Sequence, residues 1–439
     1  MEKQSLWRVL HRAGLVLCVA LLPTAAAAQW VQLGSDLDGE VAADECGWSV
    51  SLSADGSRLA VGSPSHHGTA AFYIGHVRVF EWNGTSWVQL GPDIEGEAGL
   101  DYSGYAVSMS ADGSRVVIGA RGNDGTDEWA GHARVYQWLS PSWHQVGLDL
   151  DGEVHHDEYG RSVAISPDGS RVAVGTPYND GNGSNSGHIR VFEWGNLNWE
   201  QMGADIDGEA AEDYSGESVS LSADGSRVAI GAPRNGGNGS YSGHVRVFEW
   251  ASPSWVQVGS DIDGEAAGDQ SGSSISLSAD GTRVAIGALG NDGGGDNAGH
   301  VRVYEWVNPS WVQIGSDIDG EATGDQSGTS ISLSADGTQV AIGARKNNDG
   351  GFWSGHVRVF EWGGSDWVQV GSDIDGEAVS DESGWSVTLS ADGWRVAIGA
   401  PQNDGNGEGS GHVRAFDSAL VFADGFEWSD TSAWSVVVP

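Results

Sequence analysis

Short runs in which apolar and polar residues alternate follow one another along this chain, separated by glycine-rich turns. One unit contains four such runs, at Ser274–Ser278, Arg283–Ala288, Val301–Trp306 and Trp311–Gly315. Alternation with a period of two is typical of β-strands, whereas an amphipathic helix has an apolar period of about 3.6. Between the first two runs, Ser278–Gly281 contains an Asp-Gly pair that tolerates the positive φ angles of a tight hairpin. The pattern therefore predicts a small four-stranded antiparallel sheet.

The unit recurs seven times, and a tryptophan marks the start of its last strand. These tryptophans are Trp30, Trp87, Trp143, Trp199, Trp255, Trp311 and Trp367. They are 57 residues apart once and 56 residues apart thereafter. Repeats of this length that consist of short strands are typical of β-propellers, in which each repeat supplies one blade.

The two ends of the repeat array complement each other. The last strand of the VRVFEW type is Val413–Phe416, and no run of the WVQxG type follows it. The first run of that second type, Trp30–Gly34, precedes every other strand. It is expected to pair with Val413–Phe416, because a closed ring leaves no free sheet edge. We predict an all-β fold: a seven-bladed β-propeller of four-stranded antiparallel blades, with the last blade closed by the N-terminal strand.

Three segments are expected: a signal peptide at 1–28, the propeller at 29–417 and a C-terminal tail at 418–439. The first contains Lys3, Arg8 and Arg12, then an apolar run at 13–22 and a run of small residues at 24–28. The apolar run is far shorter than the roughly 20 residues that span a bilayer. We therefore expect a secreted or cell-surface protein without a transmembrane segment in its mature chain. The tail is either a sorting or attachment segment or an unstructured acidic end.

The formal net charge of −40 restricts the classes of partner. Nucleic acids and anionic membranes are disfavoured, whereas cations, basic proteins and neutral glycans are not. Thirteen arginines recur at two positions of the repeat and are expected to form ion pairs between strands or blades. They are Arg78, Arg134, Arg190, Arg246, Arg302, Arg358 and Arg414 on the third strand, and Arg58, Arg115, Arg171, Arg227, Arg283 and Arg395 on the second.

Cysteine usage predicts a ring that is held together without a disulfide. Cys18 lies in the signal peptide, which leaves Cys46 alone. Other repeats have Ser103, Ser215 or Ser271 at the position of Cys46. We therefore interpret Cys46 as the equivalent of a buried serine.

Long loops connect the outer strand to the next inner strand, and the second strand to the third, so both kinds of loop should lie on the same face. The first kind begins with a D-x-D-G-E motif in six of seven copies, and Glu95 replaces the middle Asp in the second copy. Carboxylates at such spacing suit Ca²⁺, although they could equally cap turns. The candidate calcium ligands are Asp36, Asp38, Glu40, Asp149, Asp151, Glu153, Asp205, Asp207, Glu209, Asp261, Asp263, Glu265, Asp269, Asp317, Asp319, Glu321, Asp373, Asp375 and Glu377.

Histidines fall into one repeated and two unrepeated groups. The repeated residues begin the third strand and are expected to hydrogen-bond across blades. They are His76, His132, His188, His244, His300, His356 and His412. The pairs His66-His67 and His155-His156 are interpreted as loop surface, with a transition-metal site as the alternative.

Aromatic residues mark the loops between the second and third strands. They are candidate ligand-binding residues, because rings on a polar rim bind sugars and protein partners. Packing back onto the ring is the alternative interpretation. The residues are Phe72, Tyr73, Trp129, Tyr178, Tyr241, Phe352 and Trp353.

Over residues 30–416 the units resemble FG-GAP repeats, the units of integrin α-subunit propellers and of many exported bacterial proteins. The GAP element is complete at Gly231–Pro233 and Gly399–Pro401, and the aromatic-glycine pair survives at Tyr159-Gly160. The resemblance implies a propeller with a role in adhesion or matrix contact. The integrin-type calcium loop does not carry over, because its place has shrunk to Ser53–Gly56 and its copies.

We expect a non-enzymatic extracellular or cell-surface binding propeller that recognises a glycan or protein through its long-loop face, with calcium as a candidate cofactor. No unit breaks the repeat with a matched acid, base and nucleophile. Two alternatives remain: a secreted hydrolase or lyase with carboxylates at the central mouth, and a passive structural protein of the cell envelope.

Overall fold

The alternating runs form strands throughout the repeat array. The computed structural model describes residues 28–68 and 72–420. The predicted signal peptide, Cys18 and nearly all of the predicted tail lie outside these residues. Residues 28–419 form one compact unit, and the last strand continues to Leu420, past the expected boundary at 417.

Each of the seven sheets has four main strands, which are ordered from the ring axis outward. The first strands are β3 (Ser49–Leu52), β8 (Ser103–Met109), β13 (Ser162–Ile165), β18 (Ser218–Leu221), β23 (Ser271–Leu277), β28 (Ser327–Leu333) and β33 (Ser386–Leu389). The second strands are β4 (Arg58–Ser63), β9 (Arg115–Ala120), β14 (Arg171–Thr176), β19 (Arg227–Ala232), β24 (Arg283–Ala288), β29 (Gln339–Ala344) and β34 (Arg395–Ala400).

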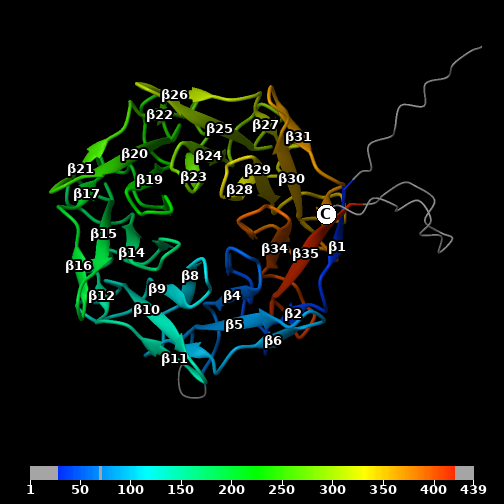
Figure 1. Ribbon diagram of the computed structural model, residues 1–439. Helices are drawn as coiled ribbons and strands as arrows, with labels where there is room; N and C mark the ends of the chain where they lie inside the picture. The colour runs from blue at the N-terminus through cyan, green and yellow to red at the C-terminus, as the bar shows by residue number, and fades with distance from the viewer. Residues whose placement is uncertain (1–27, 69–71, 421–439) are drawn as a thin grey trace, which may run out of the picture. The chain divides into compact units, whose positions relative to one another are not determined.

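The third strands are β5 (His76–Trp82), β10 (His132–Leu139), β15 (His188–Trp194), β20 (His244–Ala251), β25 (His300–Val307), β30 (His356–Trp362) and β35 (His412–Leu420). The outer strands are β1 (Ala28–Gln32), β6 (Trp87–Gln89), β11 (Ser142–Gln145), β16 (Trp199–Gln201), β21 (Ser254–Gln257), β26 (Ser310–Gln313) and β31 (Trp367–Gln369). Figure 1 shows the seven sheets arranged around a ring.

A two-residue strand follows each outer strand and also pairs with the third strand of its sheet. These short strands are β2 (Leu37–Asp38), β7 (Ile94–Glu95), β12 (Leu150–Asp151), β17 (Ile206–Asp207), β22 (Ile262–Asp263), β27 (Ile318–Asp319) and β32 (Ile374–Asp375). The start of the D-x-D-G-E motif is therefore part of the sheet, because Asp263 pairs with His244 and Ile262 with Val245.

The core lies between successive sheets, so the second strand of each sheet is apolar on both faces. In β24, every residue after Arg283 is buried. Val301 packs with Ile331 and Val340 of the following sheet. Gly287 is required there, because a Cβ atom would clash with the carbonyl oxygen of Gly328 in the next sheet.

Polar side chains also connect neighbouring sheets. The Nε1 atom of Trp311 donates a hydrogen bond to the carbonyl oxygen of Val258, at 2.9 Å. Arg302 reaches back to the carbonyl oxygen of Asp263 at 2.8 Å, and Arg283 reaches forward to that of Gly337 at 3.1 Å. Arg302 also forms the expected ion pair between blades, with 3.6 Å between its Nη1 atom and Oε1 of Glu265. The repeated arginines thus stabilise the ring.

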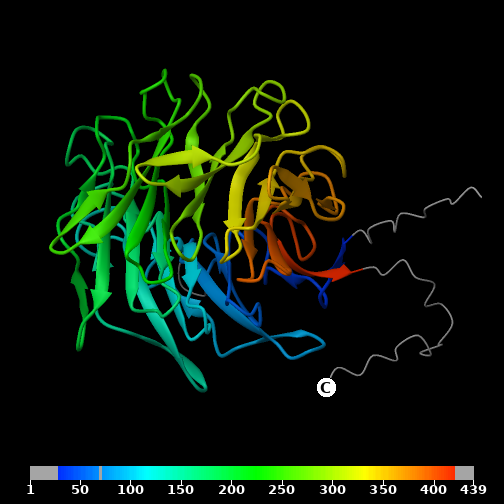
Figure 2. The same cartoon turned by 45° about the horizontal axis from the view of Figure 1, so that its top comes forward.

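The N-terminal strand closes the ring as predicted. β1 and β2 pair with β35 in the last sheet, and the two ends of the array lie side by side in Figures 1 and 2. Leu33 N donates to Ala415 O at 2.7 Å, and Trp30 Nε1 donates to Val370 O at 3.0 Å. Cys46 forms an isolated parallel β-bridge with Gly411, as Ser103 does with Gly75. Both side chains are buried, which confirms that Cys46 takes the place of the buried serine.

Within residues 28–68 and 72–420, no helix is long and apolar enough to cross a membrane.

Candidate functional site

The two kinds of long loop meet at one end of the ring axis, where they surround a cavity of about 360 Å³ that we call the mouth. Tyr214 and Gln270 come from the loops that follow outer strands, and Pro233 and Arg234 from a loop between second and third strands. The expectation that both kinds of loop share one face is confirmed.

One position of the repeat lines the mouth in every blade, immediately before or at the start of the first strand. The flanking residues are nearly the same in all repeats, but this position differs from blade to blade. In chain order it is occupied by Trp48, Tyr105, Arg161, Glu217, Ser273, Thr329 and Trp385. The mouth is therefore chemically asymmetric on a scaffold that is otherwise close to sevenfold.

Aromatic rings form one side of the mouth. The ring of Trp48 lies 4.4 Å from that of Trp385 and 5.3 Å from that of Tyr105, between centroids. All three side chains are only partly buried. Tyr178 and Tyr214 continue the aromatic lining and contact each other edge to face at 5.2 Å.

Paired charges form the rest of the mouth. Arg161 donates two hydrogen bonds of 2.9 Å to the carboxylate of Glu217, and a third of 3.2 Å to Glu158. Glu158 also accepts a hydrogen bond from Arg121, and Arg345 lies 3.8 Å from Glu382. Burial raises the pKa of the Glu382 carboxyl, and the positive charge of Arg345 offsets only part of this effect.

Five basic residues after residue 28 lie outside the two repeated arginine positions, and three of them line the mouth. Arg161, Arg234 and Arg345 line the mouth. Arg121 lies 4.5 Å from the ring of Tyr105, and Lys346 lies 5.0 Å from that of Trp353. Because most of these arginines face a glutamate, the mouth offers planar hydrogen-bonding groups without a large net charge.

The predicted aromatic residues lie on the loops between second and third strands, and one of them is among the residues that line the mouth. Tyr178 lines it, and the rings of Tyr73, Tyr102 and Trp129 form a chain with centroids 5.5 and 5.9 Å apart. The others are at the surface, where Phe352 stacks on Trp353 at 4.6 Å. Phe72 is 72% exposed and Tyr241 is 50% exposed. The alternative of packing back onto the ring does not apply to these two.

Four of these aromatics occupy a strained backbone position. Tyr73, Trp129, Tyr241 and Trp353 have φ angles of 53°, 55°, 58° and 54°. The same repeat position has Asn185, Asn297 and Gly409 in other blades. Asn and Gly tolerate this left-handed conformation, whereas a bulky residue is strained there by about 1 kcal/mol or more. An aromatic ring is therefore retained at a cost in stability, as is typical of functional sites.

The acidic loops have a different arrangement from a single-loop calcium site. The Asp that begins a motif and the Glu that ends it lie beside different histidines. Asp317 Oδ2 is 3.9 Å from Nδ1 of His300 in the same blade, whereas Glu321 Oε2 is 3.9 Å from Nδ1 of His356 in the next. Each of these inter-blade clusters thus combines a Glu from one motif, a His, and the first Asp of the next motif.

The aspartates of these loops also form hydrogen bonds within their own loop. The first Asp of the motif accepts a hydrogen bond from a glutamine, as in Gln257 to Asp261 at 2.6 Å. Asp269 is buried and accepts hydrogen bonds from the backbone N–H groups of Glu265 and Ala266. A turn-capping role is therefore visible for Asp269, whereas the first Asp of the motif binds a glutamine side chain.

The repeated histidines are buried, and the expectation that they hydrogen-bond across blades is wrong. Within the described residues, none of the seven rings forms a hydrogen bond. Their nearest carboxylate oxygens lie 3.9 to 4.0 Å away, beyond hydrogen-bonding distance. Burial, assisted by the charge of Arg302, lowers the pKa of His300 to about 4.

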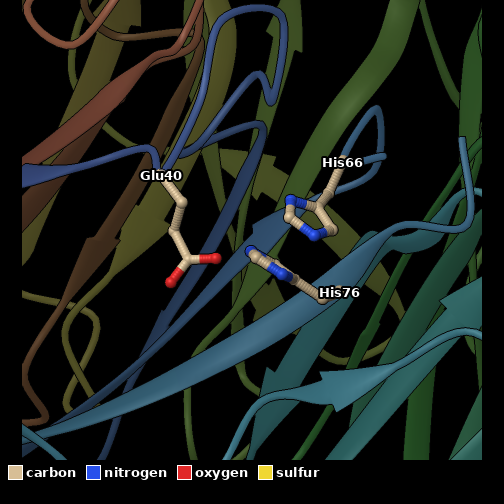
Figure 3. Close-up of side chains that lie close together, drawn as sticks. All are labelled: Glu40, His66 and His76. Atoms are coloured by element: carbon tan, nitrogen blue, oxygen red, sulfur yellow. The ribbon is translucent and has the colours of Figure 1, made fainter. Parts of the chain in front are cut away.

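Blade 1 departs from this arrangement, and the expectation that His66 lies on the surface is also wrong. His66 occupies the place of Asn123, Asn179 and their equivalents, and only 9% of it is exposed. Its Nδ1 atom lies 3.0 Å from Oδ1 of Asp44, and its ring stacks on His76 at 4.0 Å. Figure 3 shows Glu40, His66 and His76 directed toward one another.

Sequence reasoning missed the residues that line the mouth. The signal was present as a position that changes from Trp to Tyr, Arg, Glu, Ser and Thr between otherwise similar repeats. Such a position is hard to recognise in sequence, because the features that define a repeat are the ones its copies share.

Known proteins support the fold and the repeat type. Residues 149–192 match the FG-GAP repeat family, and no curated protein matches the sequence. Hydrazine synthase from Kuenenia stuttgartiensis is similar in structure, with a TM-score of 0.54 and 15% identity over 89% of this chain and 98% of that one. A candidate 6-phosphogluconolactonase from Bacteroides uniformis has a TM-score of 0.52 and 12% identity, over 75% and 85%. Such low identities show the fold alone. The repeat match and the seven-bladed ring together fit an FG-GAP repeat propeller protein.

Proposed function

We propose that this chain is a non-enzymatic binding propeller, secreted or held at the cell surface, that recognises a neutral glycan at its mouth. The observation that carries the proposal is the asymmetric ring formed by Trp48, Tyr105, Arg161, Glu217, Ser273, Thr329 and Trp385. A ligand without sevenfold symmetry needs such a departure from the repeat.

The chemistry of the mouth favours a sugar. Aromatic faces such as those of Trp48 and Trp385 pack against the apolar faces of pyranose rings. The paired groups of Arg161 and Glu217 donate and accept hydrogen bonds, as hydroxyl groups require. A neutral glycan is preferred to an acidic one, because a chain of net charge −40 repels polyanions.

The size of the mouth favours a glycan over a protein partner. Its volume of about 360 Å³ lies within the range of roughly 300–1,000 Å³ that is typical of small-ligand sites. A stable protein interface would need about 800 Å² on each partner. The surface aromatics Phe352 and Trp353 lie outside the mouth and would contact a longer polysaccharide.

The proposal is tested by affinity electrophoresis of the purified protein in gels that contain matched neutral or acidic polysaccharides. We expect retardation by at least one neutral polysaccharide and a loss of retardation in Trp48→Ser. Serine already occupies this position as Ser273, so the variant should fold. Retardation by acidic polysaccharides alone, or equal retardation of the variant, would contradict the proposal.

The enzyme alternative predicts turnover of the same glycan. Both carboxylate oxygens of Glu217 accept one hydrogen bond from Arg161, which orients the group and leaves an acceptor site on each oxygen. Release of reducing ends from a bound polysaccharide would identify a hydrolase. Calcium assistance is tested separately, by thermal unfolding in millimolar Ca²⁺ against chelator with Mg²⁺ as the control.

A further inference from the structure

Blade 1 contains a group of side chains that the other six blades lack. His66, which follows β4, and His76, which begins β5, bring two imidazoles together, and Glu40 from the loop after β2 faces them (Figure 3). One ligand atom from each lies within 4.8 Å of the others. Asp93 adds a second carboxylate, with Oδ2 3.9 Å from Nδ1 of His76.

The ring of His76 has no polar partner in this cluster. It is fully buried, and neither ring nitrogen has a hydrogen-bond partner among residues 28–68 and 72–420. A buried imidazole without a partner is costly unless another group satisfies its lone pair.

Asp44 orients the second imidazole. It is fully buried, and its Oδ1 atom accepts a hydrogen bond from Nδ1 of His66 at 3.0 Å, which leaves Nε2 free for a ligand. A carboxylate that holds the far nitrogen of a metal-binding histidine is a recurrent feature of zinc sites.

Glu40 is the one glutamate of the inter-blade clusters without an arginine. In the other six clusters an arginine Nη1 atom lies 3.2 to 3.8 Å from the corresponding glutamate. For Arg78 and Glu40 no such pair lies within 4 Å, in the part of the chain that the structure describes. Arg78 contacts the carbonyl oxygen of Asp38 and the sulfur of Cys46 instead.

We propose that Glu40, His66, His76 and Asp93 form a binding site for one divalent transition-metal ion, with Zn²⁺ as the best match. Two imidazoles and two carboxylates suit Zn²⁺ better than Ca²⁺, which takes oxygen ligands. Zinc ligands in a tetrahedron lie roughly 3.4 Å apart, so the exposed Glu40 must move inward. His66 must also tilt, because its ring is only 25° from parallel with that of His76.

The site would connect the first sheet to the N-terminal segment that closes the last one. Glu40 follows β2, which pairs with β35, whereas His66, His76 and Asp93 belong to blade 1. A bound ion would therefore hold the ring together at the place where its two ends meet, and it would raise the unfolding temperature.

The chain itself supplies the test variants. His66→Asn restores the residue that six other blades have, so it should fold, and Asn235→His recreates the blade 1 arrangement beside Asp213 and His244. Zinc binding to the metal-free protein is measured by calorimetry, and Co²⁺ is used as a visible probe of four-coordinate geometry.

We expect one Zn²⁺ per chain in the unmodified protein, binding at least tenfold weaker in His66→Asn, and a second ion in Asn235→His. Asp44→Asn should weaken binding by about 10- to 100-fold, as positioning groups do. The proposal would be overturned by equal binding to the protein and to His66→Asn, or by no binding at all. It would also be overturned by seven ions per chain, or by the absence of a second ion in Asn235→His.

Discussion

Arg161 and Glu217 occupy the same position of two successive repeats, and their side chains meet at the mouth through two hydrogen bonds of 2.9 Å. A repeat position that elsewhere has tryptophan, serine or threonine has here produced a matched ion pair. The arginine also donates a hydrogen bond to Glu158 at 3.2 Å, so its position affects the fold as well as any ligand.

The exchange Arg161→Glu with Glu217→Arg separates these two contributions. Each single change places like charges together and should lower the free energy of unfolding by about 1–3 kcal/mol. The double exchange restores the pair but not the hydrogen bond to Glu158, so it should recover part of that loss. Glycan affinity should stay low in the double variant, because the donor and acceptor have changed places. Recovery of both properties would mean that the pair has only a structural role.

Tyr241→Asn tests whether an aromatic ring is retained at a cost in stability. The φ angle of Tyr241 is 58°, and Asn185 and Asn297 occupy the equivalent position. The change should leave the free energy of unfolding unchanged or raise it by up to about 1 kcal/mol, because asparagine tolerates this conformation. The unfolding temperature should then stay the same or rise. Binding of long polysaccharides should weaken. A clear loss of stability would show instead that the ring packs on the fold.

The buried histidines predict acid sensitivity above the range of ordinary carboxylates. Burial lowers the pKa of His132, His188, His300 and His356 to about 4. Because the unfolded chain binds these protons near pH 6.5, stability is full above that pH and is lost as the pH falls toward 4. Asp319 opposes the trend, since burial raises its pKa and favours the folded state in acid.

This acid sensitivity is measured as the thermal midpoint between pH 7.5 and 4. We expect a steady fall that begins below about pH 6.5. The variant His300→Asn, which removes one buried imidazole from between Glu265, Asp317 and Arg302, should show a shallower fall. A midpoint that is flat down to pH 4.5 would contradict the account.

Closure of the ring by the N-terminal strand predicts the effect of removing β1 and β2. Trp30, Leu33 and Leu37 pack against the hydrophobic clusters at the junction, and each partly buried side chain contributes roughly 1–2 kcal/mol. Removal also leaves β35 as an unpaired edge, which favours self-association. Urea unfolding and gel filtration should show a lower midpoint and larger species, whereas an equally stable monomer would exclude the closure as a source of stability.

Most of the fold can be predicted from the repeat. Strand order and blade number follow from the recurring tryptophans. The pairing of the two ends follows because no run of the WVQxG type comes after Val413–Phe416. The two-residue strand at Ile262–Asp263 could not be predicted from alternation, because it is too short to show a period. The grouping of a Glu from one blade with a His from the next depends on how sheets face each other, which sequence spacing does not encode.

The mouth could be predicted only in part. Tyr178 was among the expected aromatic residues, whereas Trp48 and Trp385 were hidden inside the repeat pattern. Likewise, His66 seemed an isolated loop residue because its partner Asp44 is 22 positions away. In both places the informative signal is a departure from the repeat, and its meaning depends on which side chains the ring brings together.

The most direct test of the account is a calorimetric titration with a neutral oligosaccharide that the protein binds. It is carried out on the unmodified protein and on a variant with Trp48→Ser and Trp385→Thr. Both replacements copy residues that other blades have at this position, Ser273 and Thr329. The account predicts an unchanged unfolding temperature within a few degrees and an affinity at least tenfold lower, since each stacking ring contributes about 1 kcal/mol or more. Equal affinity in the two proteins would contradict a glycan site at the mouth.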